Sequence, residues 1–364
     1  SLLKEKHFII VMNKILLNKE IFRFANRMEK PIKLETLLKY NFNSFKKNPT
    51  FKIGFKDDLL TRLSKRTVEL ENLPYGLSAM PSIKNLSGWY IKSFQELYDY
   101  NNFTDDDELI NILTKIYDRH ADTSEKITEG LKQLNNSMSE RYNEDIFNFL
   151  KNHGHLPFGN FEKLNNALDD FYTNRFSVRL LIDQYINYDN KKDNYVGVIN
   201  KKTSPIKILN DAVEDAKNLS EHNYYDSPEI NINSLTDPTL CYIPSHLYYV
   251  FFELIKNAIR ASMESNKEPI DIVISGDEDI MIKISDKGNG IPYSDLKKIW
   301  YYSYTSVDKN FYNNKIDPRD VPMAGFGLGL PISRSILKFL GGDIELMSIE
   351  NYGTDVYISL PKEK

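Results

Sequence analysis

The chain has 364 residues, of which 41% are hydrophobic and 27% are charged, and its formal net charge is −4. This length exceeds that of one typical hydrophobic core and predicts two domains, while the weakly acidic balance excludes nucleic acid as an expected partner. A single cysteine, Cys241, excludes an intrachain disulfide framework and a structural zinc site, and no apolar run approaches the ~20 residues that span a bilayer.

The first half of the chain has a helical hydrophobic period. The stretch from Met12 to Arg27 fits either an imperfect organelle transit signal or a docked first helix. Four long amphipathic segments follow, at residues 59–73, 86–100, 108–134 and 164–186. Such helices joined by loops predict an antiparallel, all-α four-helix bundle. The polar stretch Asn187–Asn194 is the predicted linker, so the domains are expected at residues 1–190 and 191–364.

Three polar residues of this half lie on apolar helix stripes or one turn from them. Arg175 interrupts the apolar stripe of the last helix, Arg179 lies one turn later, and His120 lies on the stripe of segment 108–134. An inward arginine is commonly a paired core charge. Two arginines and a histidine that face one cavity would instead bind a carboxylate. Both interpretations stay open at this point.

The second half shows strand patterns separated by helical ones. Two hairpins are predicted, from residues 270–275 with 280–285 and from residues 342–349 with 353–360. Helices are expected at residues 205–222, 245–265 and 330–340. The prediction is an α+β sandwich, in which a mixed, mostly antiparallel sheet carries its helices on one face. Cys241, in "LCYIP", is interpreted as a small strand residue.

The helix at residues 245–265 carries a polar stripe opposite its apolar one. Glu253, Asn257 and Arg260 are separated by four and three residues, so they share a face. A solvated surface helix shows the same pattern, and the stripe alone therefore does not define a site.

Two glycine-rich turns lie near this helix in the predicted domain. "DKGNG" (Asp286 to Gly290) follows a strand directly, and it fits a strand-ending turn or a close approach of the backbone to a ligand. "GFGLGLP" (Gly325 to Pro331) opens a helix, where free N–H groups and the helix dipole suit phosphates. The stretch from Trp300 to Met323 has no sustained period and is expected to be a lid.

Taken together, these motifs resemble a known superfamily and, within it, one family. "ELIKNA", "DKGNG", "GFGLGL" and "YGTD" resemble the four ATP-site boxes shared by gyrase, Hsp90, histidine kinases and MutL, which have the Bergerat-type ATP-binding fold. "LPYGLSAMPSI", "WYIKSFQEL", "RHAD" and "FYTNRFSVRLL" extend the resemblance to the mitochondrial α-ketoacid dehydrogenase kinases, the pyruvate and branched-chain enzymes. The resemblance runs from about residue 22 to residue 360 in matching order.

The family resemblance implies a protein-serine kinase. The implied substrate is the dehydrogenase α-subunit of an α-ketoacid dehydrogenase complex, which phosphorylation inactivates. It further implies a mitochondrial-matrix homodimer that uses ATP and Mg²⁺, with K⁺ as a further candidate cation and a lipoyl-bearing acyltransferase core as a candidate partner.

Site roles follow from side-chain chemistry and from the resemblance. Glu253 would accept the proton of the attacking hydroxyl, and Lys256 and Arg260 would neutralise charge on the transferred phosphoryl group. The Asn257 carbonyl is suited to Mg²⁺, a hard cation that takes few protein ligands. Asp286 is suited to accept a hydrogen bond from the adenine amino group. The other expected nucleotide contacts are Gly288, Gly290, Gly325, Phe326, Gly327, Leu328, Gly329, Leu330 and Thr354. By resemblance, His120, Arg175 and Arg179 would form an allosteric α-ketoacid pocket.

Two positions depart from the pyruvate-directed enzymes. Tyr249 stands where those enzymes carry a histidine four residues before the glutamate, and Tyr117 stands where they carry an arginine. "SHLYYVFFEL" and "YSYTS" are closer to the pyruvate branch, so the substrate stays open. Two further functions are alternatives: an ATPase that drives conformational change, and a non-catalytic ATP-binding scaffold.

Overall fold

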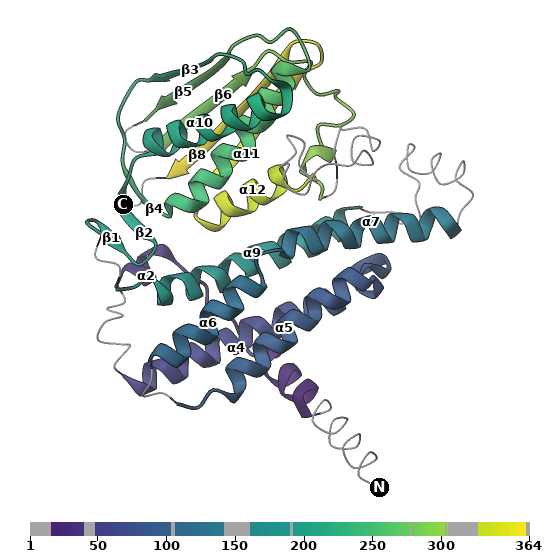
Figure 1. Ribbon diagram of the computed structural model, residues 1–364, viewed down its shortest axis with the longest axis vertical. Helices are drawn as coiled ribbons and strands as arrows, with labels where there is room; N and C mark the ends of the chain where they lie inside the picture. Colours follow the sequence, from purple (N-terminus) through teal and green to yellow (C-terminus); the bar gives the residue numbers. More distant parts are fainter. Residues whose placement is uncertain are drawn as a thin grey trace. The chain divides into compact units, whose positions relative to one another are not determined.

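The computed structural model describes residues 16–39, 48–102, 106–141, 161–189, 192–276, 279–302, 304 and 327–361 (Figure 1). The chain divides into two compact units, residues 1–190 and 191–364, which are named below the helical unit and the sheet unit. Within the described ranges, no helix is long and apolar enough to cross a membrane.

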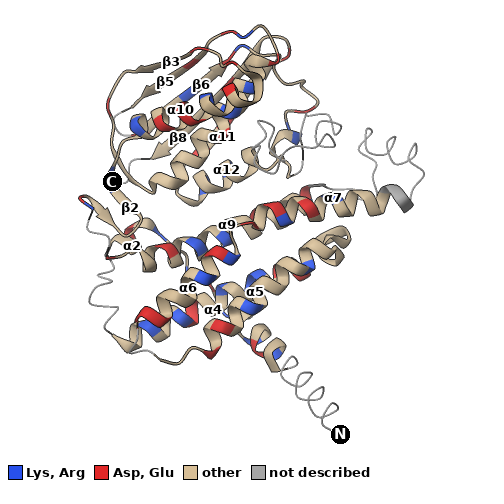
Figure 2. Ribbon diagram, in the orientation of Figure 1, with Lys and Arg blue, Asp and Glu red and all other residues tan. Residues whose placement is uncertain are grey.

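The helical unit consists of helices that pack in pairs, most of which are not consecutive in the chain. Its elements are α2 (Leu34–Lys39), α4 (Pro49–Glu71), the 3₁₀ helix η1 (Pro74–Ala79), α5 (Pro81–Asp99), α6 (Asp106–Arg119), α7 (Thr123–Arg141) and α9 (Phe161–Ile186). Helix α4 packs against α5 and α9, α5 also packs against α7, and α6 packs against α9. Acidic and basic residues both occur along these helices (Figure 2), and four basic residues of α4 are buried: Lys52, Lys56, Arg62 and Arg66. The predicted all-α N-terminal half is confirmed.

The segment predicted as one helix, residues 108–134, is in fact two, because the chain turns at His120–Asp122 between α6 and α7. The His120 carbonyl accepts hydrogen bonds from Thr123 Oγ1 and Arg175 Nη2, both at 2.8 Å. These side-chain donors satisfy a carbonyl that would otherwise need the next helical turn. The apolar period continues across the break, so the sequence pattern gave no sign of it.

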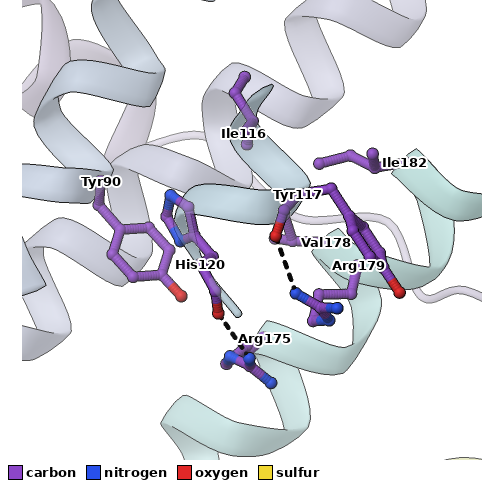
Figure 3. A pocket seen from close by; sticks show the side chains of 8 residues that line it. All are labelled: Tyr90, Ile116, Tyr117, His120, Arg175, Val178, Arg179 and Ile182. Carbon is purple, nitrogen blue, oxygen red and sulfur yellow. Dashed lines mark hydrogen bonds between the residues drawn. The ribbon is translucent and has the colours of Figure 1, made fainter. Parts of the chain in front are cut away.

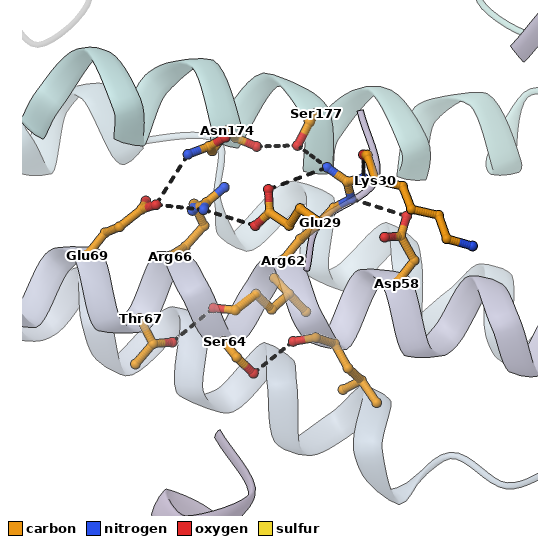
Figure 4. Close-up of polar contacts among 12 residues, drawn as sticks. Glu29, Lys30, Asp58, Arg62, Ser64, Arg66, Thr67, Glu69, Asn174 and Ser177 are labelled. Atoms are coloured by element: carbon orange, nitrogen blue, oxygen red, sulfur yellow. Dashed lines mark hydrogen bonds and ion pairs between the residues drawn. The ribbon is translucent and has the colours of Figure 1, made fainter. Parts of the chain in front are cut away.

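A buried ionic network joins α4 to the segment before α2 and to α9 (Figure 4). Arg66, 1% exposed, bonds Glu69 at 2.7 Å and Glu29 at 3.1 Å. Arg62 Nη1 donates to Ser177 Oγ at 2.9 Å, and Asn174 Nδ2 donates to Glu69 Oε1 at 3.2 Å. Because buried charges are stable only when paired, the network fixes the position of α9 on α4.

The sheet unit contains a five-stranded mixed sheet in the order β3 (Ile230–Ser234), β5 (Ile270–Ser275), β6 (Asp279–Asp286), β8 (Gly353–Pro361), β7 (Asp343–Ile349). Strands β3 and β5 are parallel, and the other pairs are antiparallel. A smaller sheet has the order β1 (Tyr195–Val196), β2 (Ile199–Thr203), β4 (Leu240–Tyr242), and it contains Cys241.

Helices cover one face of the larger sheet (Figure 1). They are α10 (Pro205–Tyr224), α11 (Pro244–Met263) and α12 (Gly329–Phe339), with a 3₁₀ turn, η2, at Lys298–Trp300. Alternate residues of β5 and β6 are buried beneath them, which is why isoleucine occupies every second position in these strands. The predicted helices, both hairpins and the α+β class are confirmed.

Candidate functional site

The polar stripe of α11 is not a solvated face throughout. The side chains of Glu253 and Lys256 are 13% and 7% exposed, and Lys256 Nζ donates to Glu253 Oε1 at 2.7 Å. Asn257 is exposed, so its amide oxygen is open to a ligand. Arg260 Nε lies 3.6 Å from Glu264 Oε1, toward the C-terminal end of the helix. The stripe therefore combines a held carboxylate with an accessible amide.

The carboxylate that ends β6 is buried in the sheet. Asp286 is 9% exposed and accepts a hydrogen bond from the Gly288 N–H at 3.0 Å. Burial raises the pKa of Asp286 to about 6, and the hydrogen bonds from the Gly288 and Thr354 N–H groups oppose this rise. Thr354 lies opposite Asp286 in the β6–β8 register, and its Oγ1 is 2.8 Å from Ser348 Oγ. The buried Asp286 carboxylate, with the Thr354 and Ser348 hydroxyls nearby, can therefore accept a hydrogen bond from a ligand.

The turn after Asp286 is held close to two neighbouring elements. A Cβ on Gly288 would lie 2.7 Å from both Cβ and the carbonyl oxygen of Ala261 on α11. Gly290 has φ 64°, and a Cβ there would overlap the Ile349 carbonyl oxygen. Both glycines are therefore required by structure, one by close approach and one by a left-handed backbone. The strand-ending-turn interpretation of this motif holds for the folded chain.

The glycine-rich start of α12 reaches the other part of the α11 stripe. Gly327 has φ 75°, and a Cβ on Gly329 would overlap Glu253 Oε2. Leu328 is buried and Leu330 is half-buried. Gly325 and Phe326 lie outside the described residues, as does most of the expected lid, at residues 303 and 305–326.

Helix α11 thus connects two parts of one site. Its Glu253 meets the start of α12, and its Ala261, eight residues later and about 12 Å along the axis, meets the turn after Asp286. An extended nucleoside triphosphate can span such a distance.

The sequence analysis missed Ala261 and Ser348. Ser348 could have been found, because the β7–β8 hairpin register places it beside Thr354.

The described residues offer a metal ion single oxygen donors on α11 and no preformed cage of ligands. Across the described residues, no group of three or more His, Cys, Asp or Glu side chains could hold a metal. Mg²⁺ retains phosphate and water ligands and needs few protein atoms, so the exposed amide of Asn257 suits it.

The helical unit contains the predicted histidine–arginine cluster in a pocket (Figure 3). Its lining comes from α5, α6, α9 and the turn after α6, namely Tyr90, Ile116, Tyr117, His120, Arg175, Val178, Arg179 and Ile182. Arg175 Nη2 donates to the His120 carbonyl, and Arg179 Nη1 donates to the Tyr117 carbonyl at 3.1 Å. Tyr90 was missed by the sequence analysis, and it packs edge-on to His120 with ring centroids 4.0 Å apart.

Positive charge dominates this pocket. Burial, together with nearby Arg175, lowers the pKa of His120 to about 3, so the imidazole is neutral, and Ser93 Oγ lies 2.8 Å from its Nε2. Within the described part of the chain, Arg175 forms no ion pair, and its Nε has no hydrogen-bond partner. The Arg179 guanidinium stacks on the Tyr117 ring at 3.8 Å. The two guanidinium groups make the pocket suited to an anion.

A mixed sheet with helices on one face, a buried aspartate at a strand end and a glycine-rich helix start define an ATP-binding domain. The family model described as histidine kinase-, DNA gyrase B- and HSP90-like ATPase matches residues 242–364. The model described as mitochondrial branched-chain alpha-ketoacid dehydrogenase kinase matches residues 31–200.

Relatives match across both units. A mitochondrial pyruvate dehydrogenase (acetyl-transferring) kinase of Arabidopsis thaliana is 32% identical over 321 residues, covering 84% of this chain and 82% of that protein. Isozyme 4 of the same kinase from Mus musculus is 30% identical over 366 residues, covering 95% and 84%. The chain belongs to the family of mitochondrial α-ketoacid dehydrogenase kinases, and it is an ATP-binding protein kinase. The ATPase and scaffold alternatives are not favoured.

Proposed function

We propose that the chain transfers the γ-phosphoryl group of ATP to a serine in the α-subunit of a pyruvate dehydrogenase complex in the mitochondrial matrix, and thereby inactivates that complex. The names of its relatives support this substrate. The model that matches residues 31–200 carries the branched-chain name, which makes the branched-chain complex the second candidate. The observation that carries the catalytic proposal is the Glu253 carboxylate held against the start of α12.

The proposed reaction uses Glu253 as the general base. Its carboxylate takes the proton of the serine hydroxyl as the serine oxygen bonds to the γ-phosphorus. The bond from this phosphorus to the bridging oxygen breaks, and ADP leaves with that oxygen. Lys256 is within 2.7 Å of Glu253, and with Arg260 it supplies positive charge near the transferred group.

The proposed nucleotide contacts divide along α11. Asp286 accepts from the adenine amino group, Thr354 assists through water, and the backbone of Gly288 and Gly290 contacts the purine. Asn257 would hold Mg²⁺, which neutralises phosphate charge when bound. The proposed triphosphate contacts are Gly325, Phe326, Gly327, Leu328, Gly329 and Leu330. K⁺ stays a candidate second cation in this proposal.

We propose that the pocket of the helical unit binds the carboxylate of an α-ketoacid and regulates the kinase. Arg175 and Arg179 supply the charge, and His120 lines the pocket as a neutral imidazole whose Nε2 lies 2.8 Å from Ser93 Oγ. Replacing both arginines with methionine should abolish inhibition by pyruvate and by branched-chain ketoacids while kinase activity remains. Inhibition that persists unchanged in this variant would remove the pocket from the proposal.

Assembly follows the same family proposal. The chain is proposed to form a homodimer and to bind the lipoyl domain of an acyltransferase core. Sedimentation velocity, with and without a lipoylated domain, measures the oligomeric state and the binding of that domain. A monomer that does not bind the domain would contradict the assembly proposal and leave the kinase proposal unaffected.

The kinase proposal is tested by phosphate transfer from labelled ATP and Mg²⁺ to the pyruvate and branched-chain α-subunits, offered side by side. Glu253→Gln is the control, and it should lose ~10²-fold or more of the rate because the base is removed. Transfer to one subunit only names the substrate. No transfer to either would contradict the proposed substrate class, and equal rates in the variant would contradict the role of Glu253.

A further inference from the structure

Gly329 is a glycine whose backbone does not require glycine. It is the first residue of α12, and its φ is not among the positive values that mark Gly327 and Gly290. Alanine would be favoured over glycine at a helical position by up to about 1 kcal/mol. Something other than backbone conformation must therefore make a side chain unwelcome at this position.

The obstruction comes from one side chain. The three atoms nearest to a Cβ on Gly329 all belong to Glu253: Oε2, which it would overlap, Cδ at 3.0 Å and Cγ at 3.5 Å. The situation at Gly288 differs, because there the backbone of Ala261 also blocks a side chain. At Gly329 the protein could accommodate a methyl group by moving one flexible carboxylate.

The two oxygens of this carboxylate have different neighbours. Oε1 accepts the Lys256 ammonium hydrogen at 2.7 Å, whereas Oε2 faces the Cα of Gly329. Lys256 is 5% exposed, and its Nζ lies 5.4 Å from the Phe252 ring centroid, so the ammonium is itself held in place. The carboxylate is thereby confined between a fixed cation and the first turn of α12.

We propose that Gly329 is a positioning residue for Glu253: the missing side chain leaves the space in which Oε2 is held for proton acceptance. The inference rests on the proposed role of Glu253 as the base. Gly329 keeps its proposed contact with the triphosphate through its backbone N–H, which an added methyl group leaves in place. The inferred effect of its missing side chain is on the position of the base.

The test measures how much kcat falls when one methyl group is added at residue 329, first in the parent protein and then in the Glu253→Asp variant. Gly329→Ala in the otherwise unchanged protein should lower kcat by about 10- to 100-fold, because misplacing a catalytic group by about 1 Å has effects of this size. The KM and Kd for ATP should stay within about twofold. In the Glu253→Asp background, the carboxylate is one methylene shorter, and the same methyl should change the remaining kcat by no more than about twofold.

The matched control is Gly54→Ala, a helical glycine of α4 with no atom within 4 Å of an added Cβ. It should leave kcat unchanged, and its thermal midpoint should equal or exceed that of the parent, because alanine is favoured over glycine in a helix. An equal loss from the methyl in both backgrounds, or a loss confined to ATP affinity, overturns the inference. Those outcomes leave the proposed function intact, whereas an active Glu253→Gln variant refutes the base itself.

Discussion

Among single residues, Asp286 shows how a buried carboxylate, proposed here to bind adenine, lowers the stability of the folded protein. Its pKa rises from 3.8 to about 6, chiefly through burial. Between these values the folded protein keeps a proton that the unfolded chain has released, so the free energy of unfolding falls as pH rises through this window. The full penalty, on the order of 3 kcal/mol, is present above pH 6.

We therefore expect Asp286→Asn to change stability and ATP affinity in opposite directions. At pH 7 the variant should resist urea better than the parent by about 1–3 kcal/mol, and this gain should shrink as pH falls from 6 to 4. Its ATP Kd should rise by about 10-fold or more, because a charged acceptor is lost. Urea titrations across pH measure the free energy of unfolding, and calorimetry measures the ATP Kd. A stability gain over the parent that is smaller at pH 7 than at pH 4 would contradict this account.

The Lys256–Glu253 pair should behave as a buried ion pair. Lys256→Met leaves a largely buried carboxylate without its cation, and we expect a loss of roughly 3 kcal/mol in the free energy of unfolding. Adding Glu253→Gln should recover most of the loss, since no buried charge then remains. Equilibrium urea unfolding of the parent, both single variants and the double variant measures these free energies. A double variant no more stable than Lys256→Met would show that the unpaired Glu253 charge is not the cause of the loss.

Between elements, the contact that matters most for the site is the one between α11 and the end of β6. Gly288→Ala would press a methyl group into Ala261, where backbone atoms cannot yield cheaply. We expect a loss of about 1–3 kcal/mol and weaker ATP binding, because α11 and the Asp286 turn must separate. Thermal unfolding with and without ATP measures both, with Gly54→Ala as the control. Unchanged stability would show that this contact is loose.

The elements that sequence could predict are those with a long, strong period. The isoleucines of β5 and β6 alternate, and α11 repeats its apolar residues every three or four positions, so their type and place were correct. Strands β1, β2 and β3 were missed, because they are short and carry polar residues such as Asn231 and Asn233. The break at His120 was missed because the apolar period continues across it, and Arg175, one of the two donors to the His120 carbonyl, is 55 residues away.

The site could be predicted as a set of motifs but not as a set of contacts. Helix period and strand ends place Glu253, Asn257 and Asp286, and the resemblance of four motifs to ATP-site boxes marks them as site residues, a role that stays a prediction. The overlap between Gly329 and Glu253 joins residues 76 positions apart, and no local pattern encodes such a distance. The burial of Lys256 depends on the same packing and was not foreseen.

For the whole molecule, each unit holds one tryptophan: Trp89 in the helical unit and Trp300 in the sheet unit, where it packs against Arg334 at 4.7 Å. Because each unit has its own core, we expect Mg²⁺–ATP to stabilise the transition seen by Trp300, by about 2.7 kcal/mol at 100 times Kd, and to leave that of Trp89 nearly unchanged. Fluorescence-detected unfolding separates the two signals, because the Trp89→Phe variant reports only on Trp300 and the Trp300→Phe variant only on Trp89. Equal shifts would mean that the units unfold together.

The order of the larger sheet has a consequence for how the protein is made. Strand β8, the last strand of the described chain, lies between β6 and β7, and it brings Thr354 opposite Asp286. During synthesis the helical unit leaves the ribosome complete while this gap in the sheet is still open. The proposed adenine end of the site therefore forms only when residues 353–361 have emerged, so we expect a nascent chain to form its helices well before it can bind a nucleotide.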